Sequence, residues 1–383
     1  MENLTHSLVG AALAELALPA TAARAHRRAF FIAGVVAANL PDADLLYTRI
    51  AAAPLGYLLH HRGHTHTVVG LLAQAALVAL VCALPAIRRR IEPLRRRFAV
   101  LVGLALASHL LLDSWNSYGV HPFWPVDARW FYGDAIYILE PWLWLPLGLA
   151  AAANAHRRSA GVAIALLVAA LVGTLAVMRM TPSTAVVALA LAAAAMVLAG
   201  RHLASRHRAA AALATVALWV AAMFAIRESA QGMVGTAMPR QPQSRVLDVV
   251  LSPSPGNPLC WNALAITLDA SAGSYRLTRG TASPLAAWGC GKGRQRVEWE
   301  APIVQSADSL RALARRDCWV RAWLQFGRAP EISGGFIADA RYGGTARDNF
   351  SSMVLRPALE AGRCPANLTA WGMPRGDLLS AGP

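Results

Sequence analysis

Four histidines fall within seven residues of one short segment. The run from His60 to Thr67 reads His-His-Arg-Gly-His-Thr-His-Thr and leads into a long apolar stretch. Neutral imidazole is the most common side-chain ligand for zinc and related metals. The run therefore predicts a metal site with His61 and His66 as ligands, because Gly63 permits a bend that brings both rings toward one ion. The other two histidines of the run are expected to be interfacial side chains.

Candidate ligands also flank this run on both sides. Upstream, Asp42 and Asp44 follow a proline, and alternate residues of an extended turn point in opposite directions. One is expected to bind an ion and the other to orient a histidine, so we assign metal binding to Asp42 and a catalytic role to Asp44. Downstream, His109 and Asp113 are four residues apart on one face of an apolar helix, where ionisable groups are costly and usually functional. A capping pair and a local His–Asp hydrogen bond are the structural alternatives.

Four further residues complete the candidate set. His6, close to the N-terminus, is a candidate metal ligand. Arg62 stands between the histidines and is assigned a catalytic role, clamping a phosphate through two guanidinium nitrogens. Asp134 and Glu140 are each expected to be a helix cap or an additional carboxylate ligand.

The composition predicts that a membrane-embedded helical bundle positions these residues. Hydrophobic residues make up 56% of the chain and charged residues 15%, which is typical of several membrane-spanning helices. Apolar segments are expected at 8–23, 29–41, 68–87, 98–113, 139–155, 160–178, 184–200 and 211–226. The first two are short of the roughly 20 residues that a span needs. We therefore predict a mainly α polytopic bundle of about six full spans plus two short N-terminal helices.

The arginines are distributed unevenly between these segments. Alternate gaps hold fourteen arginines, and the intervening gaps hold four. By the positive-inside rule the arginine-rich gaps are cytoplasmic, so every candidate ligand falls on the periplasmic side of an inner membrane. Topology then explains most of the net charge of +15. The expected partners are the membrane and a lipid or amphiphilic small-molecule substrate, and not nucleic acid.

The composition changes after residue 226. Residues 1–226 are predicted to form the membrane-embedded domain with the metal site, and 227–383 a small α+β or mostly β soluble domain outside the membrane. Within it, 263–279 is typical of two strands around a turn, and 320–326 of a further strand. Four cysteines are predicted to form two disulfides in one of three pairings, with a second metal site as the alternative: Cys260, Cys290, Cys318 and Cys364.

These motifs resemble those of a membrane-bound, metal-dependent hydrolase family, the YdjM family. The matching residues, which cover roughly positions 1–145, are Thr5-His6, Asp42-Ala-Asp44, the segment from His61 to Thr67, His109-Leu-Leu-Leu-Asp113, and Trp115-Asn-Ser-Tyr-Gly119. The chain departs from the family at Glu140, where an aspartate is usual, and at His64, where an apolar residue is frequent. The resemblance implies a helical membrane fold with bound metal and a distant likeness to zinc-dependent phospholipases C and P1-type nucleases.

Motifs, topology and resemblance together predict an integral membrane metal-dependent hydrolase of the phosphodiesterase or phospholipase type. It is expected to hold one to three divalent ions, zinc foremost, and to cleave a phosphoester or ester bond with metal-activated water. The alternative is a non-enzymatic transport, sensing or interaction protein with a structural metal site. A transport pathway predicts ionisable residues along the full depth of several helices, whereas here they cluster at one edge.

Overall fold

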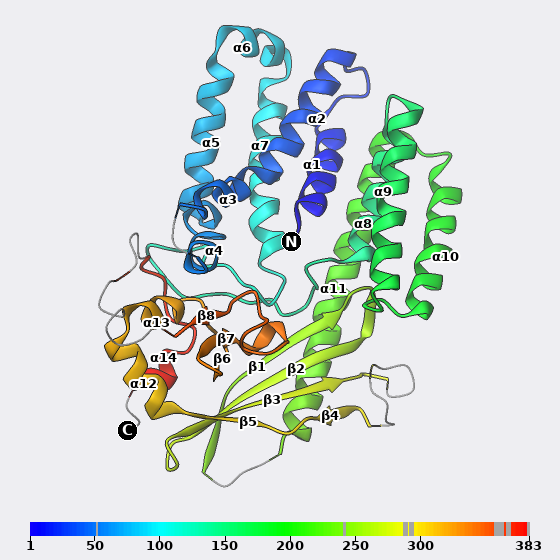
Figure 1. Cartoon of the computed structure of the whole chain (residues 1–383). Coiled ribbons are helices and arrows are strands. Elements are labelled where there is room, and N and C mark those ends of the chain that lie inside the picture. Colours follow the sequence, from blue (N-terminus) through cyan, green and yellow to red (C-terminus); the bar gives the residue numbers. More distant parts are fainter. Residues whose placement is uncertain are drawn as a thin grey trace.

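The computed structural model of the chain describes residues 1–50, 53–239, 243–285, 290, 295–355, 364 and 369–380. Helices form the first part of the chain, and two antiparallel sheets with short helices form the last part (Figure 1). The mainly helical class and the C-terminal sheet domain were both predicted from composition.

The helical part is a bundle whose members run alternately toward and away from the C-terminal sheets (Figure 1). The helices are α1 (Asn3–Ala17), α2 (Arg24–Asn39), α3 (Asp44–Tyr47), α4 (Leu55–His60), α5 (Val68–Ala83), α6 (Pro85–Ile91), α7 (Arg95–Asp113), α8 (Pro141–Asn154), α9 (Arg158–Val177), α10 (Ser183–Gly200) and α11 (Ser205–Ala237). The arginine-rich turns lie at the end remote from the sheets, where Arg97 donates to the Ala17 carbonyl (3.2 Å) and Arg208 to Asn154 Oδ1 (2.8 Å).

Four helices are long and apolar enough to cross a membrane, counted over the described residues. They are Arg24–Tyr47, Arg158–Val177, Ser183–Gly200 and Ser205–Ala237, and a fifth is added if the bent pair Leu55–His66 and Val68–Ala83 counts as one span. The predicted number of six is not confirmed. One reason is the second helix, which was expected to be short. It starts at Arg24 and continues through a 3-10 turn to Tyr47, so it reaches 24 residues.

The C-terminal part contains a five-stranded and a three-stranded antiparallel sheet. The first has the order β1-β2-β3-β4 with β5 also paired to β3, and the second has the order β6-β7-β8. The strands are β1 (Ser244–Ser254), β2 (Asn257–Asp269), β3 (Ser274–Ala282), β4 (Val297–Trp299), β5 (Ile303–Ser306), β6 (Pro330–Ser333), β7 (Phe336–Asp339) and β8 (Met353–Val354), and the helices are α12 (Ala307–Arg316), α13 (Cys318–Trp323) and α14 (Gly376–Leu379).

The local predictions for this part have mixed outcomes. The two strands expected within 263–279 are confirmed as β2 and β3. The strand expected at 320–326 is wrong, because the Asp317 side chain accepts hydrogen bonds from the Trp319 and Val320 amides and starts α13 instead. Two disulfides are present, and the structure selects one pairing: Cys260 with Cys290, and Cys318 with Cys364.

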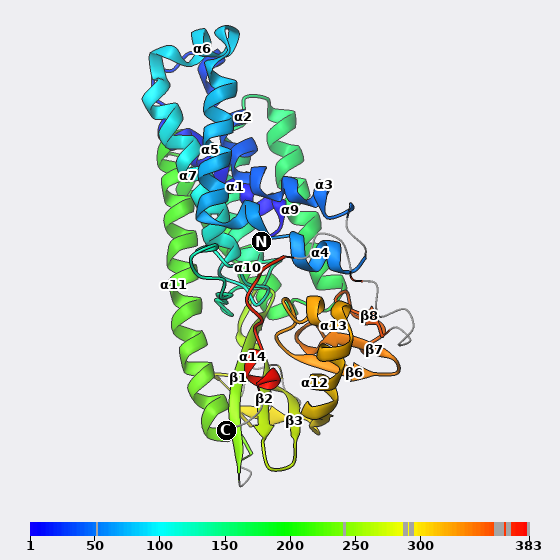
Figure 2. The same cartoon turned by 90° about the vertical axis from the view of Figure 1, so that its left-hand side faces the viewer.

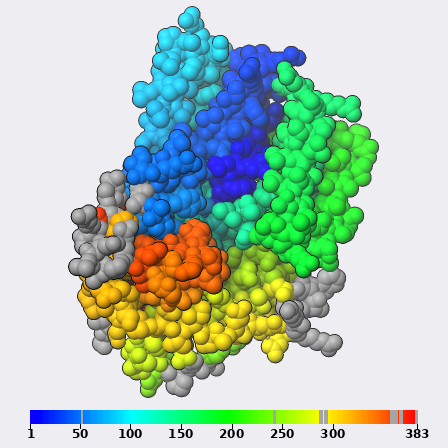
Figure 3. Space-filling view, viewed as in Figure 1, coloured from blue at the N-terminus to red at the C-terminus, as the bar shows by residue number. Residues whose placement is uncertain are grey.

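Shared hydrophobic clusters join the two parts of the chain. Leu58 and Leu59 of α4 pack in one cluster with Trp323 of α13. Val216 of α11 and Trp261 of β2 belong to a second cluster. Helix α11 continues past the predicted boundary at 226 and extends along the five-stranded sheet (Figures 1 and 2). In the space-filling view the C-terminal part covers one end of the bundle (Figure 3). The division into two domains stays a prediction.

Candidate metal centre

Helix α7 supplies two residues of the centre. Its buried positions, Phe98, Leu101, Val102, Ala105, Leu106, His109, Leu112 and Asp113, recur every three to four residues and so form one face. This face packs inside the bundle, and its last turn carries His109 and Asp113. Both side chains are buried, with exposures of 0% and 1%. The predicted one-face arrangement of this pair is confirmed.

The third residue, Asp42, comes from the end of α2. Helices α1 and α2 cross closely, because a Cβ at Gly10 would collide with the carbonyl oxygen of Gly34. Beyond α2 the chain turns through a 3-10 helix, Leu40–Ala43, and not through an extended segment. Asp42 and Asp44 still point to different partners, as the sequence predicted: Asp42 toward His66 and His109, and Asp44 toward His61 and His66.

The fourth residue, His66, sits in the turn between α4 and α5. The left-handed residue of this turn is Arg62, with a φ of 59°. Gly63 is needed for space, since a Cβ there would lie 2.7 Å from the His60 carbonyl oxygen. The Thr67 hydroxyl caps α5 by accepting from the Gly70 amide (2.9 Å), as expected from the sequence.

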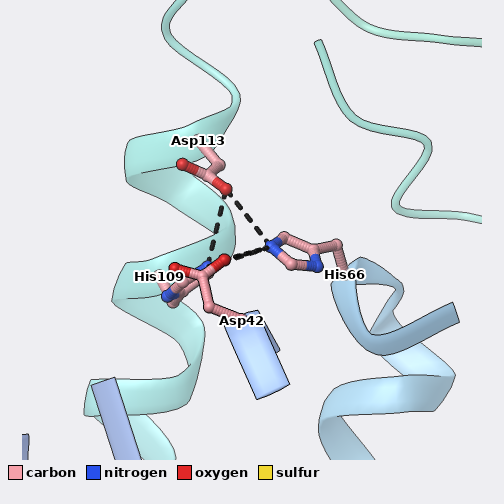
Figure 4. A group of neighbouring side chains, drawn as sticks. All are labelled: Asp42, His66, His109 and Asp113. Carbon is pink, nitrogen blue, oxygen red and sulfur yellow. Dashed lines mark hydrogen bonds and ion pairs between the residues drawn. The ribbon is translucent and has the colours of Figure 1, made fainter. Parts of the chain in front are cut away.

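The ligand atoms of these four residues converge (Figure 4). His66 Nε2 lies 3.0 Å from His109 Nε2, 3.4 Å from Asp42 Oδ1 and 3.3 Å from Asp113 Oδ2. His109 Nε2 is 3.5 Å from both Asp42 Oδ1 and Asp113 Oδ2. A tetrahedron with metal–ligand distances of about 2.0–2.1 Å has edges of roughly 3.3–3.4 Å. The spacing of the four atoms therefore fits one tetrahedral ion.

Hydrogen bonds on the outer side of both rings fix how the inner nitrogens are protonated. His109 Nδ1 lies 2.6 Å from the Ala38 carbonyl, which only accepts, so Nδ1 carries the proton. His66 Nδ1 lies 3.2 Å from Asp44 Oδ2 and 3.0 Å from Thr65 Oγ1, and that hydroxyl itself donates to Asp44. In both neutral rings Nε2 is consequently a lone pair. Two lone pairs and two carboxylates facing one another repel unless a cation lies between them.

A second group of possible ligands adjoins the first. Asp42, Asp44 and His61 also offer atoms that lie within 4.8 Å of one another. Asp44 accepts from the Arg62 amide (3.0 Å) and from the Thr65 hydroxyl (2.8 Å), and its Oδ1 is 3.1 Å from His61 Nδ1. The His61 side chain is 11% exposed, more than any residue of the first group.

Arg62 is buried beside the first group. Its Nη2 donates to Asp113 Oδ1 (3.0 Å), and its Nη1 donates to Asn116 Oδ1 (3.0 Å) and the Asp113 carbonyl (3.1 Å). The guanidinium also lies 4.7 Å from the ring centre of Tyr118. One oxygen of Asp113 is thus paired with arginine, while the other faces the histidines.

His6 also lies at the centre but outside both groups. Its ring stacks on His109 at 3.7 Å between centroids, and Nε2 is 3.4 Å from Asp113 Oδ1. Neither ring nitrogen makes a hydrogen bond within the described chain. The Met1 amine is also in contact with Asp113 Oδ1. All eight sequence-selected residues other than Asp134 and Glu140 therefore meet in one place.

Those two acidic residues serve other contacts. Glu140 caps α8 by accepting from the Trp142 amide (3.2 Å), and it also accepts from the Gly256 amide (3.5 Å). Asp134 pairs with Arg328 of the C-terminal part (2.9 Å). Neither belongs to a possible metal group among the described residues.

Sequence reasoning missed several supporting residues. Asn3 donates to Asp42 Oδ2 (2.6 Å), Thr65 contacts both Asp44 and His66, and Asn116 holds Arg62. Asn116 lies inside a motif that the family resemblance singled out, so that signal was available. Asn3 carried none, since its partner is 39 residues away.

Comparison with known proteins agrees with this geometry. A family model described as YdjM inner membrane protein matches residues 1–184, which include both ligand groups. The chain is 34% identical over 137 residues to inner membrane protein YbcI of Escherichia coli (strain K12), a match that covers 30% of this chain and 76% of that protein. No solved structure matches the chain. The chain belongs to the YdjM family of inner membrane proteins.

Proposed function

We propose that this membrane protein is a metal-dependent hydrolase whose first cation is held by Asp42, His66, His109 and Asp113. The observation that carries the proposal is the set of four buried acceptor atoms at tetrahedral spacing with no proton available between them. Two imidazole nitrogens and two carboxylate oxygens in tetrahedral geometry favour zinc. Bound zinc would supply a Lewis acid and a water molecule whose pKa is lowered toward about 7.

The charges of the centre support a divalent ion. Asp42, Asp44 and Asp113 carry three negative charges, and Arg62 is the side chain that contributes a positive one. With neutral histidines the side chains sum to two negative charges. One divalent cation balances them, which lowers the cost of keeping the carboxylates buried.

We assign the reacting position to the second group. Four protein ligands close the coordination of an ion, whereas catalytic zinc sites usually have three and leave one position for water or substrate. Asp42, Asp44 and His61 provide three, with Asp42 shared between the groups. His61 faces Tyr57, whose ring is 4.9 Å away and 41% exposed, so the approach to the centre is on this side.

The surroundings of this approach favour an amphiphilic substrate. Leu46 and Ile50 are 77% and 72% exposed and lie on the segment that follows the aspartates, and Phe350 of the C-terminal part, 49% exposed, faces Tyr57. Apolar side chains beside a membrane-level centre suit the hydrocarbon part of a lipid, and the metal suits its phosphoester or ester. With the arginine-rich turns cytoplasmic, the substrate would be reached from the periplasmic leaflet.

Arg62 holds Asp113 in this proposal. Its two Nη atoms are engaged by Asp113, Asn116 and the Gly119 carbonyl. Direct clamping of a substrate phosphate would require release of some of these bonds and stays a prediction. His6 as a ligand stays a prediction as well. Asp44 in a catalytic role corresponds here to a ligand of the reacting ion.

The test combines metal analysis with activity. Detergent-purified protein is assayed for zinc and screened against phosphodiester and ester substrates, with His66→Ala and Asp113→Ala as variants. We expect bound zinc and a hydrolytic activity that both variants abolish. Zinc without activity on any lipid-like ester would favour the structural alternative, and activity that survives both variants would refute the proposal.

A further inference from the structure

A separate cavity lies at the arginine-rich end of the bundle. It has a volume of about 400 Å³ and is bounded by α8, α10 and α11. Its walls are small or apolar, including Pro146, Ala150, Val197 and Ala211. This volume is within the range of about 300–1,000 Å³ that is usual for ligand pockets. The metal centre is at the opposite ends of the helices, so the cavity belongs to neither ligand group.

Two arginines stand at one side of this cavity. Arg201 donates to the Leu198 carbonyl (3.2 Å), and Arg208 donates to Asn154 Oδ1 (2.8 Å) and the Leu203 carbonyl (2.7 Å), all neutral oxygens. No aspartate or glutamate occurs in the sequence between Glu140 and Glu228. The positive charges at the cavity therefore have no local carboxylate to neutralise them.

The cavity is continuous with the surface that faces lipid. Val197 lines it and is 55% exposed on α10, a helix apolar enough to span a membrane. A hydrocarbon chain in the bilayer can enter such a gap without crossing a polar layer. Basic pockets between spanning helices bind acidic lipid headgroups by attraction to the phosphate.

We propose that this cavity binds an anionic phospholipid of the leaflet at the arginine-rich end. One acyl chain occupies the apolar space between α10 and α11, and the phosphate lies against Arg201 and Arg208. The occupant is specific in its charge, because two unneutralised guanidinium groups favour a net negative headgroup over a zwitterionic one.

Native mass spectrometry of the full chain with added phosphatidylglycerol or phosphatidylcholine tests the proposal. Wild-type protein is expected to bind phosphatidylglycerol preferentially. Arg201→Gln with Arg208→Gln is expected to weaken that binding roughly thirtyfold. The matched control, Arg157→Gln with Arg158→Gln, removes the same charge at the same end without touching the cavity wall and is expected to bind like wild type.

A second pair of variants separates the cavity from the charge. Ala211→Phe fills the cavity, whereas Ala210→Phe adds the same ring to the next residue, which does not line it. The first is expected to displace the lipid and the second to retain it, with unchanged helical content in circular dichroism for both. Equal binding of the two lipids by wild type, or equal losses in variants and controls, would overturn the proposal.

Discussion

Two buried clusters of charged side chains lie near the junction of the bundle and the C-terminal part, and they are neutralised in different ways. In the first, Arg328 donates to Asp134 (3.0 Å) and to Asp248 (2.7 Å), and Arg375 lies 3.5 Å from Asp248. Two positive charges thus meet two negative ones. In the metal centre three carboxylates share Arg62 alone among the side chains. The first cluster is complete within the chain, whereas the second requires a cation from outside.

The environment of Arg328 shows what complete pairing does. Burial opposes its charge, but Asp134 and Asp248 outweigh burial and raise the pKa of Arg328 above its ordinary value. The guanidinium therefore stays charged and joins the loop after α7 to the C-terminal part. The same chain thus contains an ion-pair network for cohesion and an acceptor cluster suited to a metal.

Chelation should have the largest effect. Removing the ion from the wild-type protein should lower the free energy of unfolding by as much as about 10 kcal/mol, because an ion bound only to the folded state stabilises it. Thermal unfolding with and without a strong chelator measures this. Asp42→Asn, which removes the carboxylate shared by both groups, should unfold at a temperature that the chelator no longer changes. A chelator-insensitive wild type would contradict the comparison.

Loss of Arg328 should come next. Arg328→Ala should cost about 3–5 kcal/mol in the free energy of unfolding, since it leaves Asp134 and Asp248 buried without their partner. Zinc content should stay at the wild-type level. Chemical denaturation with parallel metal analysis checks both, and the exposed Arg316→Ala is the control with little expected change. If Arg328→Ala releases the metal, the two clusters are not independent.

Removal of the Asp44 charge should have a smaller effect. Asp44→Asn should weaken zinc affinity about 10–100-fold, because the carboxylate orients His66 through Nδ1 and adjoins the second group. Competition with a fluorescent zinc chelator measures the change. Asp127→Asn, which alters a carboxylate paired with exposed Arg129, should bind zinc like wild type. Equal affinities for the Asp44 variant and wild type would remove Asp44 from the centre.

The smallest effect concerns pH. His121 is buried against Trp371 (4.0 Å between ring centres) and Trp130 (4.5 Å), and burial lowers its pKa to about 3. Between the unfolded value of about 6.5 and the folded value, only the unfolded state takes up a proton, so stability falls as pH decreases through this window. The loss should be about 1 kcal/mol from pH 6 to pH 5. His121→Phe should flatten this slope in tryptophan-monitored unfolding, and an unchanged slope would assign it to other groups.

The sequence predicted the parts of the centre that depend on local spacing. The pair on α7 follows from a four-residue interval on an apolar face, and the divergence of Asp42 and Asp44 follows from their separation by one residue. The structural role of Arg62 did not follow, because its partner Asp113 is 51 residues away. The helix at Cys318–Trp323 was missed because its apolar pattern is also that of a strand, and the cap at Asp317 decides between them.

Metal stoichiometry of the purified protein is the most direct test of the cation-requiring centre. Wild type and Arg328→Ala should each contain at least one zinc per chain, whereas His66→Ala and His109→Ala should contain none. His61→Ala should retain the first ion and lose any second one, because His61 belongs only to the second group. Wild-type protein that takes up no divalent metal when supplied with zinc, or that retains it in both histidine variants of the first group, would contradict the assignment.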